Sequence, residues 1–144
     1  MIKIICPGKI KERYLKEAID DYLKRISKYH KVGIVEVEDS NMDEEADRIL
    51  KNVSARDYVI TLEIDGKSMT SLEFAYKLDK LFINNSNICF IIGGSDGLSK
   101  KVKDRSDFAL SFSSFTFPHQ LFRLILLEQI YRAFKILKNE TYHK

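Results

Sequence analysis

The sequence contains no long apolar segment. Hydrophobic residues make up 44% of its 144 residues, yet no run approaches the roughly 20 consecutive apolar residues that a membrane-spanning helix needs. The first residues, Met1 to Cys6, also lack a basic region followed by a long apolar stretch and a small-residue cleavage site, which are the features of an export signal. We therefore expect a soluble, cytoplasmic protein.

Cysteine is scarce and is not arranged for metal binding. Cys6 and Cys89 each lie in an apolar, strand-like run without CxxC spacing, a pattern that is typical of buried thiols. His30, His119 and His143 also lack metal-ligand spacing, and no nucleophile triad is visible. The simpler interpretation is a mechanism without a metal. His119 is expected at the start of a helix, where it would make local hydrogen bonds.

The chain also carries little net charge. Its 24 Lys and Arg residues against 21 Asp and Glu residues give +3, which permits an RNA partner without demonstrating one. Basic residues gather at 9–31, at 100–105 and along the last predicted helix, whereas 36–47 is strongly acidic. A chain of this length suits one compact domain, over residues 1–144, and is too short for two.

Apolar residues recur at strand and helix spacings in alternation along the chain. These spacings predict strands at residues 1–6, 33–38, 57–62, 87–92 and 108–112, and helices at 10–31, 41–52, 71–82 and 118–138. Residues 63–68 predict a polar loop, 33–38 a strand at or near a sheet edge, and 87–92 a central strand, because this run is the most continuously apolar. Strands that alternate with helices indicate an α/β domain with a mostly parallel sheet flanked by helices.

Glycine is concentrated directly after the predicted central strand. The sequence there is Gly93-Gly94-Ser95-Asp96-Gly97-Leu98-Ser99, with Ser99 as a helix cap. Glycines at the carboxyl end of a strand let the backbone approach a ligand closely. The run is neither GxGxxG nor a P-loop, and a tight turn without a ligand would explain it equally well.

A second polar and aromatic segment follows the last predicted strand. Residues 111–120 are Ser-Phe-Ser-Ser-Phe-Thr-Phe-Pro-His-Gln, with Pro118 where a helix begins. An apolar loop that also offers backbone polar groups suits an adenine, and a well-packed loop without a ligand is the alternative. The helix that follows is apolar on more sides than one sheet face can cover, which favours a homodimer.

The sequence closes with Tyr142-His143-Lys144. Taken in order, the glycine turn, the 113–118 segment and this ending resemble the SPOUT, or α/β-knot, RNA methyltransferases. The resemblance is closest to the small single-domain type that methylates N3 of a pseudouridine in 23S ribosomal RNA, and it is clearest over residues 88–144. It implies a C-terminal trefoil knot, which is rare among folds, and a dimer with its active site at the subunit junction.

The resemblance also implies roles for individual residues. S-adenosylmethionine is expected to contact ten of them: Leu62, Gly93, Gly94, Gly97, Ser113, Ser114, Phe115, Thr116, Phe117 and Pro118. The RNA substrate is expected at the tail, with Tyr142 stacking on a base and Lys144 touching a phosphate. His143 is the candidate for proton or substrate handling, and Arg132 is the candidate for electrostatic support.

The activity that the resemblance implies is transfer of the methyl group of S-adenosylmethionine to N3 of a pseudouridine, on the assembled ribosome rather than on naked RNA. A methyltransferase of the same fold that acts on transfer RNA is one alternative. A noncatalytic RNA-binding or ribosome-associated module is another. A dinucleotide-binding oxidoreductase is poorly supported, because no early strand is followed by GxGxxG and a distal acidic partner.

Overall fold

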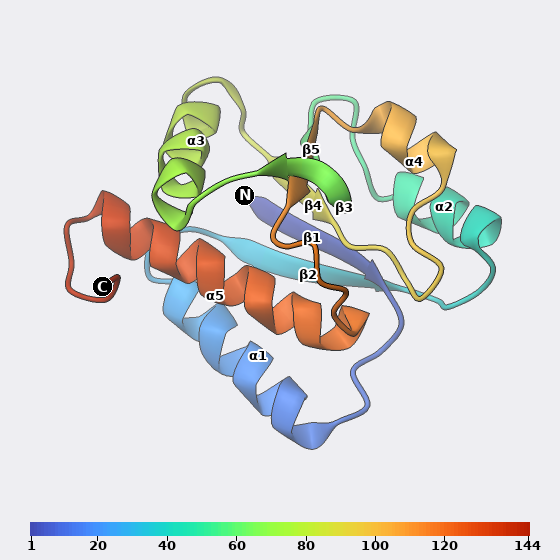
Figure 1. Cartoon of the computed structure of the whole chain (residues 1–144), viewed down its shortest axis with the longest axis horizontal. Helices are drawn as coiled ribbons and strands as arrows, with labels where there is room; N and C mark the ends of the chain where they lie inside the picture. Colours follow the sequence, from blue (N-terminus) through green and yellow to red (C-terminus); the bar gives the residue numbers. More distant parts are fainter.

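The computed structural model describes all residues of the chain, 1–144. Strands and helices alternate along it (Figure 1), in the order β1 (Ile2–Pro7), α1 (Arg13–Ile26), β2 (Val32–Val37), α2 (Met42–Leu50), β3 (Tyr58–Ser68), α3 (Ser71–Asn84), β4 (Ile88–Ile91), α4 (Lys100–Arg105), β5 (Phe108–Ser111) and α5 (His119–Leu137).

The five strands form one sheet in the order β2-β1-β4-β3-β5, and every neighbouring pair is parallel. The predicted α/β class is therefore confirmed. Strand β4 lies inside the sheet and β2 lies at its edge, and both positions were predicted. Because all strands run the same way, their carboxyl ends meet at one edge of the sheet, which is where ligands bind in open α/β sheets. We call this edge the carboxyl edge.

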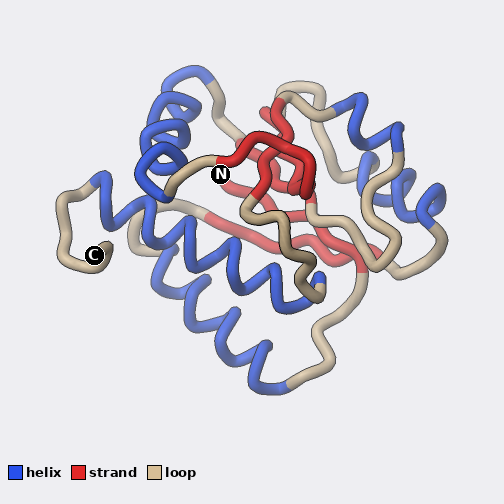
Figure 2. Tube along the Cα trace, viewed as in Figure 1, coloured by secondary structure: helices blue, strands red, loops and turns tan.

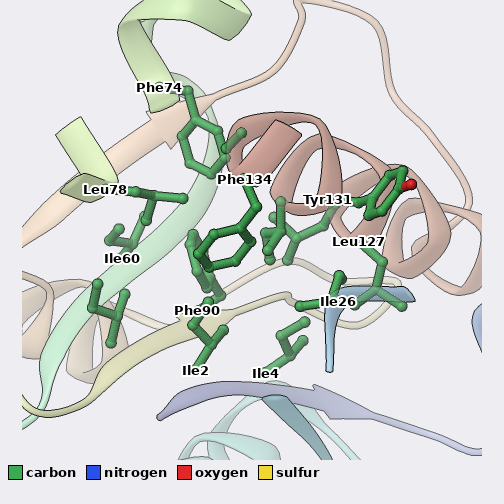
Figure 3. Close-up of a cluster of buried hydrophobic side chains, with 14 of the residues drawn as sticks. Ile2, Ile4, Ile26, Ile60, Phe74, Leu78, Phe90, Leu127, Tyr131 and Phe134 are labelled. Carbon is green, nitrogen blue, oxygen red and sulfur yellow. The ribbon is translucent and has the colours of Figure 1, made fainter. Parts of the chain in front are cut away.

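Helices cover both faces of the sheet (Figures 1 and 2). Helices α1, α5 and α3 pack on one face, and α2 and α4 pack on the other. Successive strand residues point to opposite faces, so Ile4 joins the core on the α5 side whereas Ile5 joins the core on the α2 side. Figure 3 shows the larger cluster, in which Phe90 from β4 lies near Phe134 from α5.

The two cysteines are buried, as predicted. Cys6 and Cys89 are both 0% exposed, one in each core, and both are free. Burial raises the pKa of each thiol to about 12. Both side chains are therefore protonated packing groups near neutral pH, because the thiolate is the reactive and metal-binding form.

Side-chain caps explain where three of the helices begin, and Asn41 caps α2 by accepting from the N–H of Glu44. Thr70 and Glu73 form a reciprocal capping box at the start of α3. Ser99 accepts a hydrogen bond from the N–H of Val102 ahead of α4, so its predicted cap is confirmed. Helix α5 begins directly after Pro118, whose ring fixes the backbone and prevents a helical hydrogen bond from that position.

Two predicted boundaries are wrong. Residues 63–68 are not a loop, because β3 runs to Ser68 and its register against β5 shifts between Leu62 and Lys67. This irregularity keeps polar residues extended and exposed, so no apolar period marks the strand. The first helix spans Arg13–Ile26 rather than 10–31, because residues 8–12 form the connection from β1.

Helix α5 is the longest helix, and it lies between α1 and α3 on its face of the sheet (Figure 1). The chain turns back beyond the end of this helix, as the loop at the C-terminus shows in Figure 2. None of the helices is both long and apolar enough to cross a membrane. The knot that the family resemblance implies stays a prediction.

Candidate functional site

A cavity of about 790 Å³ opens at the carboxyl ends of β4 and β5 and beside the register shift in the middle of β3. Its volume is in the range of small-molecule sites in proteins. It is lined by nine of the ten residues predicted to contact the methyl donor, namely Leu62, Gly93, Gly94, Gly97, Ser113, Phe115, Thr116, Phe117 and Pro118. Ser114 does not line it. The fold therefore brings together three segments that are far apart in the sequence.

The glycine turn forms one wall of the cavity. The N–H of Gly97 donates to the carbonyl of Gly94 at 3.0 Å, and Gly97 has a φ of 81°, which favours glycine. A Cβ on Gly93 would lie 2.8 Å from the carbonyl carbon of Gly97. A Cβ on Gly94 would instead meet the carboxylate of Glu45 at 2.9 Å. The backbone of this turn thus requires glycine at 93 and 97, whereas Gly94 makes room for the Glu45 side chain.

The loop after β5 forms the opposite wall. The Ser113 hydroxyl accepts a hydrogen bond from the N–H of Phe115 at 3.0 Å, a local turn that holds the loop open. Phe115 is 79% exposed, so its ring is available to a ligand. His119 is the first residue of α5, as predicted, and lines the cavity. Its expected local hydrogen bonds are not formed.

The cavity also carries charged residues that sequence reasoning did not assign to it. Glu63, Asp65 and Asp96 supply three carboxylates, and Lys103 supplies one ammonium group. Glu63 is the most constrained of them, since it accepts a hydrogen bond from Thr61 at 2.6 Å and lies 3.8 Å from the Lys103 nitrogen. These carboxylates give the cavity an excess of negative charge.

The tail residues form a second group on the C-terminal half of α5. The Arg132 guanidinium donates to Glu128 at 2.8 Å and lies 3.0 Å from Nδ1 of His143. The Tyr142 hydroxyl donates to the same Glu128 carboxylate at 2.9 Å. Burial, together with hydrogen bonds to Tyr22 and Glu128, raises the pKa of Tyr142, so this phenol stays protonated. Lys144 is exposed.

The structure does not bring the two groups together within one chain. Phe122 at the cavity and Arg132 at the tail are ten residues apart on α5, which corresponds to roughly 15 Å along the helix axis. Figure 1 shows the same separation, with the C-terminus at the end of α5 that lies away from the cavity loops. The residues predicted to hold the donor and the substrate are therefore two separate half-sites.

A family model described as "Predicted SPOUT methyltransferase" matches residues 1–143. The chain belongs to this family. Membership confirms the resemblance noted from the sequence, and it implies a methyl donor of the S-adenosylmethionine type in general terms.

Two curated relatives match this SPOUT chain over 99% of its length and 99% of their own. Both are named ribosomal RNA large subunit methyltransferase H. The protein of Finegoldia magna is 52% identical, and that of Carboxydothermus hydrogenoformans is 50% identical. A solved structure, of a probable methylase family protein from Haemophilus influenzae Rd KW20, has a TM-score of 0.59 at 12% identity and covers 99% of this chain and 70% of that one. This structural likeness supports the fold.

Sequence reasoning missed two kinds of residue in this SPOUT chain. Two of the cavity carboxylates, Glu63 and Asp65, lie in a segment interpreted as a polar loop, and the third, Asp96, lies in the glycine turn; charged loop residues are usually only solvated. Arg123 was also missed, although it is fully buried at 0% exposure on α5. An arginine inside an otherwise apolar helix is a usable signal, because arginine is almost never fully buried unless it is paired.

Proposed function

We propose that this chain transfers the methyl group of S-adenosylmethionine to N3 of a pseudouridine in 23S ribosomal RNA, acting on the large subunit of the assembled ribosome in the cytoplasm. The observation that carries the proposal is the cavity at the carboxyl edge, where the glycine turn and the 113–118 loop meet. Family membership supports it, as do relatives at 50–52% identity that are named for large-subunit ribosomal RNA.

The lining of the cavity fits S-adenosylmethionine. Aromatic side chains such as Phe115 and Phe117 offer flat apolar contacts to an adenine, and the glycine turn leaves backbone polar groups open to a ligand. The three carboxylates outnumber Lys103 and favour the positive sulfonium and ammonium groups. The bound donor would supply an electrophilic methyl group.

The protein must then orient the base so that the N3–methyl bond forms as the sulfur–methyl bond breaks, which leaves S-adenosylhomocysteine, while the weakly acidic N3 proton passes to solvent. Loss of this proton spreads negative charge over the two carbonyl oxygens that flank N3. Arginine can only donate hydrogen bonds, so Nδ1 of His143 accepts from Arg132 and the ring proton is on Nε2. Arg132 and His143 therefore present donors side by side, and we assign them to these oxygens, where charge develops in the transition state.

This assignment gives His143 the role of donor rather than proton acceptor. The Glu128 carboxylate accepts two charge-assisted hydrogen bonds, one from Arg132 at 2.8 Å and one from Tyr142 at 2.9 Å, and so holds both side chains in place. The Tyr142 ring also lies against the Arg132 guanidinium at 4.9 Å. The tail is thus ordered by its own contacts.

A homodimer would join the two half-sites. Two-fold pairing along α5 places the same surface of both subunits in contact and would bring the tail of one subunit to the cavity of the other. Helix α5 suits this pairing, because Leu121, Leu124 and Ile125 on it stay only partly buried. Such apolar exposure marks interfaces more often than free surface.

The test is methyl transfer from labelled S-adenosylmethionine to four substrates that lack the modification: large subunits, whole ribosomes, protein-free 23S RNA and transfer RNA. Digested RNA is then analysed by mass spectrometry for N3-methylpseudouridine. We expect label in ribosomal particles and in that nucleoside. Equal labelling of protein-free RNA would contradict recognition of the assembled ribosome.

Two other outcomes distinguish the alternatives. Label confined to transfer RNA would identify a methyltransferase of the same fold with a different substrate. Ribosome binding without affinity for S-adenosylmethionine, measured by calorimetry in the presence and absence of ribosomes, would identify a noncatalytic module. Either result would overturn the proposed function.

A further inference from the structure

The connection from β1 to α1 exposes two cations that have no partner in the protein. Lys9 and Lys11 are both exposed, and neither takes part in any of the chain's salt bridges. Other exposed lysines, Lys51 and Lys80 among them, are unpaired as well. Lys9 and Lys11 are distinguished by where the fold holds them rather than by free charge alone.

A fully buried arginine fixes this exposed connection. Arg123 donates to the carbonyl oxygens of Pro7 and Gly8 at 2.9 Å each, and to the carboxylate of Glu36 at 2.6 Å. Burial of a guanidinium is unfavourable unless it is paired and hydrogen-bonded. Its contacts here hold the backbone directly before Lys9.

A second contact fixes the far side of the connection. The N–H of Lys11 donates to the side chain of Gln120 at 3.3 Å. Gln120 follows His119, which lines the cavity. The two lysines are thus fastened at both ends to the first turns of α5, the same turns that form the cavity wall.

These contacts place the lysines beside the mouth of the cavity. The β1–α1 connection leaves the carboxyl edge next to β4, from which the glycine turn also leaves. Figure 1 shows this connection, the 92–99 loop and the start of α5 together on one side of the molecule, at the right of the view.

We propose that the β1–α1 connection binds the phosphate backbone of the RNA substrate through Lys9 and Lys11 and so guides the target base to the cavity. This inference rests on the proposed function and names the surface that function uses. Ammonium groups bind phosphates as point charges, and such contacts set the position of an RNA rather than reading its sequence.

The surroundings of the two lysines match a nucleic-acid contact. Tyr14, in the first turn of α1, is 68% exposed, and an exposed tyrosine next to cations can stack on a sugar or base. Asp39 lies against Gly8 on the other side and begins the acidic surface that follows β2. This acidic surface repels phosphate, so the RNA is expected to run from the lysines toward α5 and the cavity.

The test compares two double variants with equal change in charge. K9Q/K11Q removes the proposed contacts. K51Q/K80Q is the control, because Lys51 and Lys80 are exposed and unpaired near the opposite edge of the sheet, after α2 and late in α3. K9R/K11R tests whether positive charge alone is sufficient. Binding to unmodified large subunits is measured over a series of salt concentrations, with calorimetry of S-adenosylmethionine as the check that each variant is folded.

K9Q/K11Q is expected to weaken subunit binding on the order of tenfold and to lower the slope of log affinity against log salt by about 1.5, as loss of two phosphate contacts does. Affinity for S-adenosylmethionine should stay unchanged, and K9R/K11R should bind like the wild type. Equal behaviour of K9Q/K11Q and K51Q/K80Q on subunits that the wild type methylates would overturn this inference alone. Absence of methyl transfer to any ribosomal RNA by the wild type would overturn the proposed function as well.

Discussion

The guanidinium of Arg132 lies 3.0 Å from Nδ1 of His143, at the point where the tail folds back onto α5. This contact determines the tautomer of the histidine, because arginine has no acceptor atom. With Nδ1 occupied, Nε2 carries the ring proton and points a donor outward. The pair therefore acts as a unit, and removing either residue removes the donor geometry of both.

Replacing His143 by alanine is expected to lower kcat for methyl transfer about 100-fold, the effect of losing one preorganised donor to a developing oxyanion. Affinity for S-adenosylmethionine should not change, since His143 lies outside the cavity. His143→Asn should keep part of the activity, because an amide can accept from Arg132 and donate outward. Lys138→Gln, an exposed change near the end of α5, is the control. Full turnover by His143→Ala on ribosomal subunits would refute the assignment.

A mixing experiment tests whether the site is shared between subunits. His143→Ala damages the tail and Gly93→Ala damages the cavity, so a mixed dimer holds one intact composite site. An equal mixture after subunit exchange is expected to recover about a quarter of wild-type activity, given random pairing and two sites in each dimer. No recovery, although the mixed dimer is formed, would show that each site is built from one chain.

Gly93→Ala is expected to lower the affinity for S-adenosylmethionine at least about tenfold, measured by calorimetry. The added Cβ would lie 2.8 Å from backbone of Gly97, so the turn must open to admit it. Gly33→Ala is the matched control, because its nearest neighbour is the movable end of Met1 at 3.1 Å. If both variants bind the donor equally well, the turn is not part of its site.

Local patterns in the sequence predict the strands, the central place of β4 and the two loop segments that line the cavity. The apolar run before Gly93 marks a buried strand, and the hydroxyl and aromatic residues before Pro118 mark a shaped loop. Parallel strands then bring both segments to one edge. These inferences need only the period of the apolar residues and the chemistry of turns, whereas the methyl donor and its ten contact residues come from the resemblance to the SPOUT methyltransferases.

The remaining features depend on contacts between distant segments. Arg123 reaches the carbonyl of Pro7 across more than 100 residues of sequence, and no local pattern specifies that pairing. The extension of β3 beyond Leu62 follows from pairing with β5 after a register shift, which tertiary context decides. The separation of the cavity from the tail follows from the length of α5, which carries the cavity residues at its start and the tail at its end.

Glu63→Gln is expected to reduce the preference of the cavity for S-adenosylmethionine over S-adenosylhomocysteine by about threefold to tenfold, since only the former carries a sulfonium charge. Glu63 is held at the wall by Thr61 and Lys103, so its carboxylate stays near the ligand. Calorimetry with both ligands measures the ratio. Glu17→Gln, at an exposed pair on α1, is the control. An unchanged ratio would exclude a charge contribution from Glu63.

Arg123→Met is expected to lower the free energy of unfolding by about 2–4 kcal/mol, because two buried carbonyl oxygens lose their donor and an ion pair is broken. The loss is limited, since the Glu36 side chain is 37% exposed and stays hydrated. Arg25→Met, which breaks an exposed pair with Asp21, should change stability little. Urea unfolding measures both. Equal stabilities would show that Arg123 does not anchor the β1–α1 connection.

Acid should destabilise the fold in part through His30. The centroid of this ring lies 4.5 Å from that of Phe82, and its Nε2 is buried without a hydrogen-bond partner. Burial, with a smaller effect of the amino terminus, lowers its pKa below the ordinary 6.5. The unfolded chain therefore binds a proton at a pH where the folded chain does not, and the free energy of unfolding falls as pH drops below about 6.5.

His30→Phe keeps the ring stacking and removes the proton. Between about pH 7.5 and about pH 5.5, the free energy of unfolding of this variant should therefore decrease less than that of the wild type. The two slopes of unfolding free energy against pH should differ by the equivalent of at most one bound proton. Urea titrations across this range measure the slope. If His30→Phe keeps the wild-type slope, the acid sensitivity arises from carboxylates and not from this buried ring.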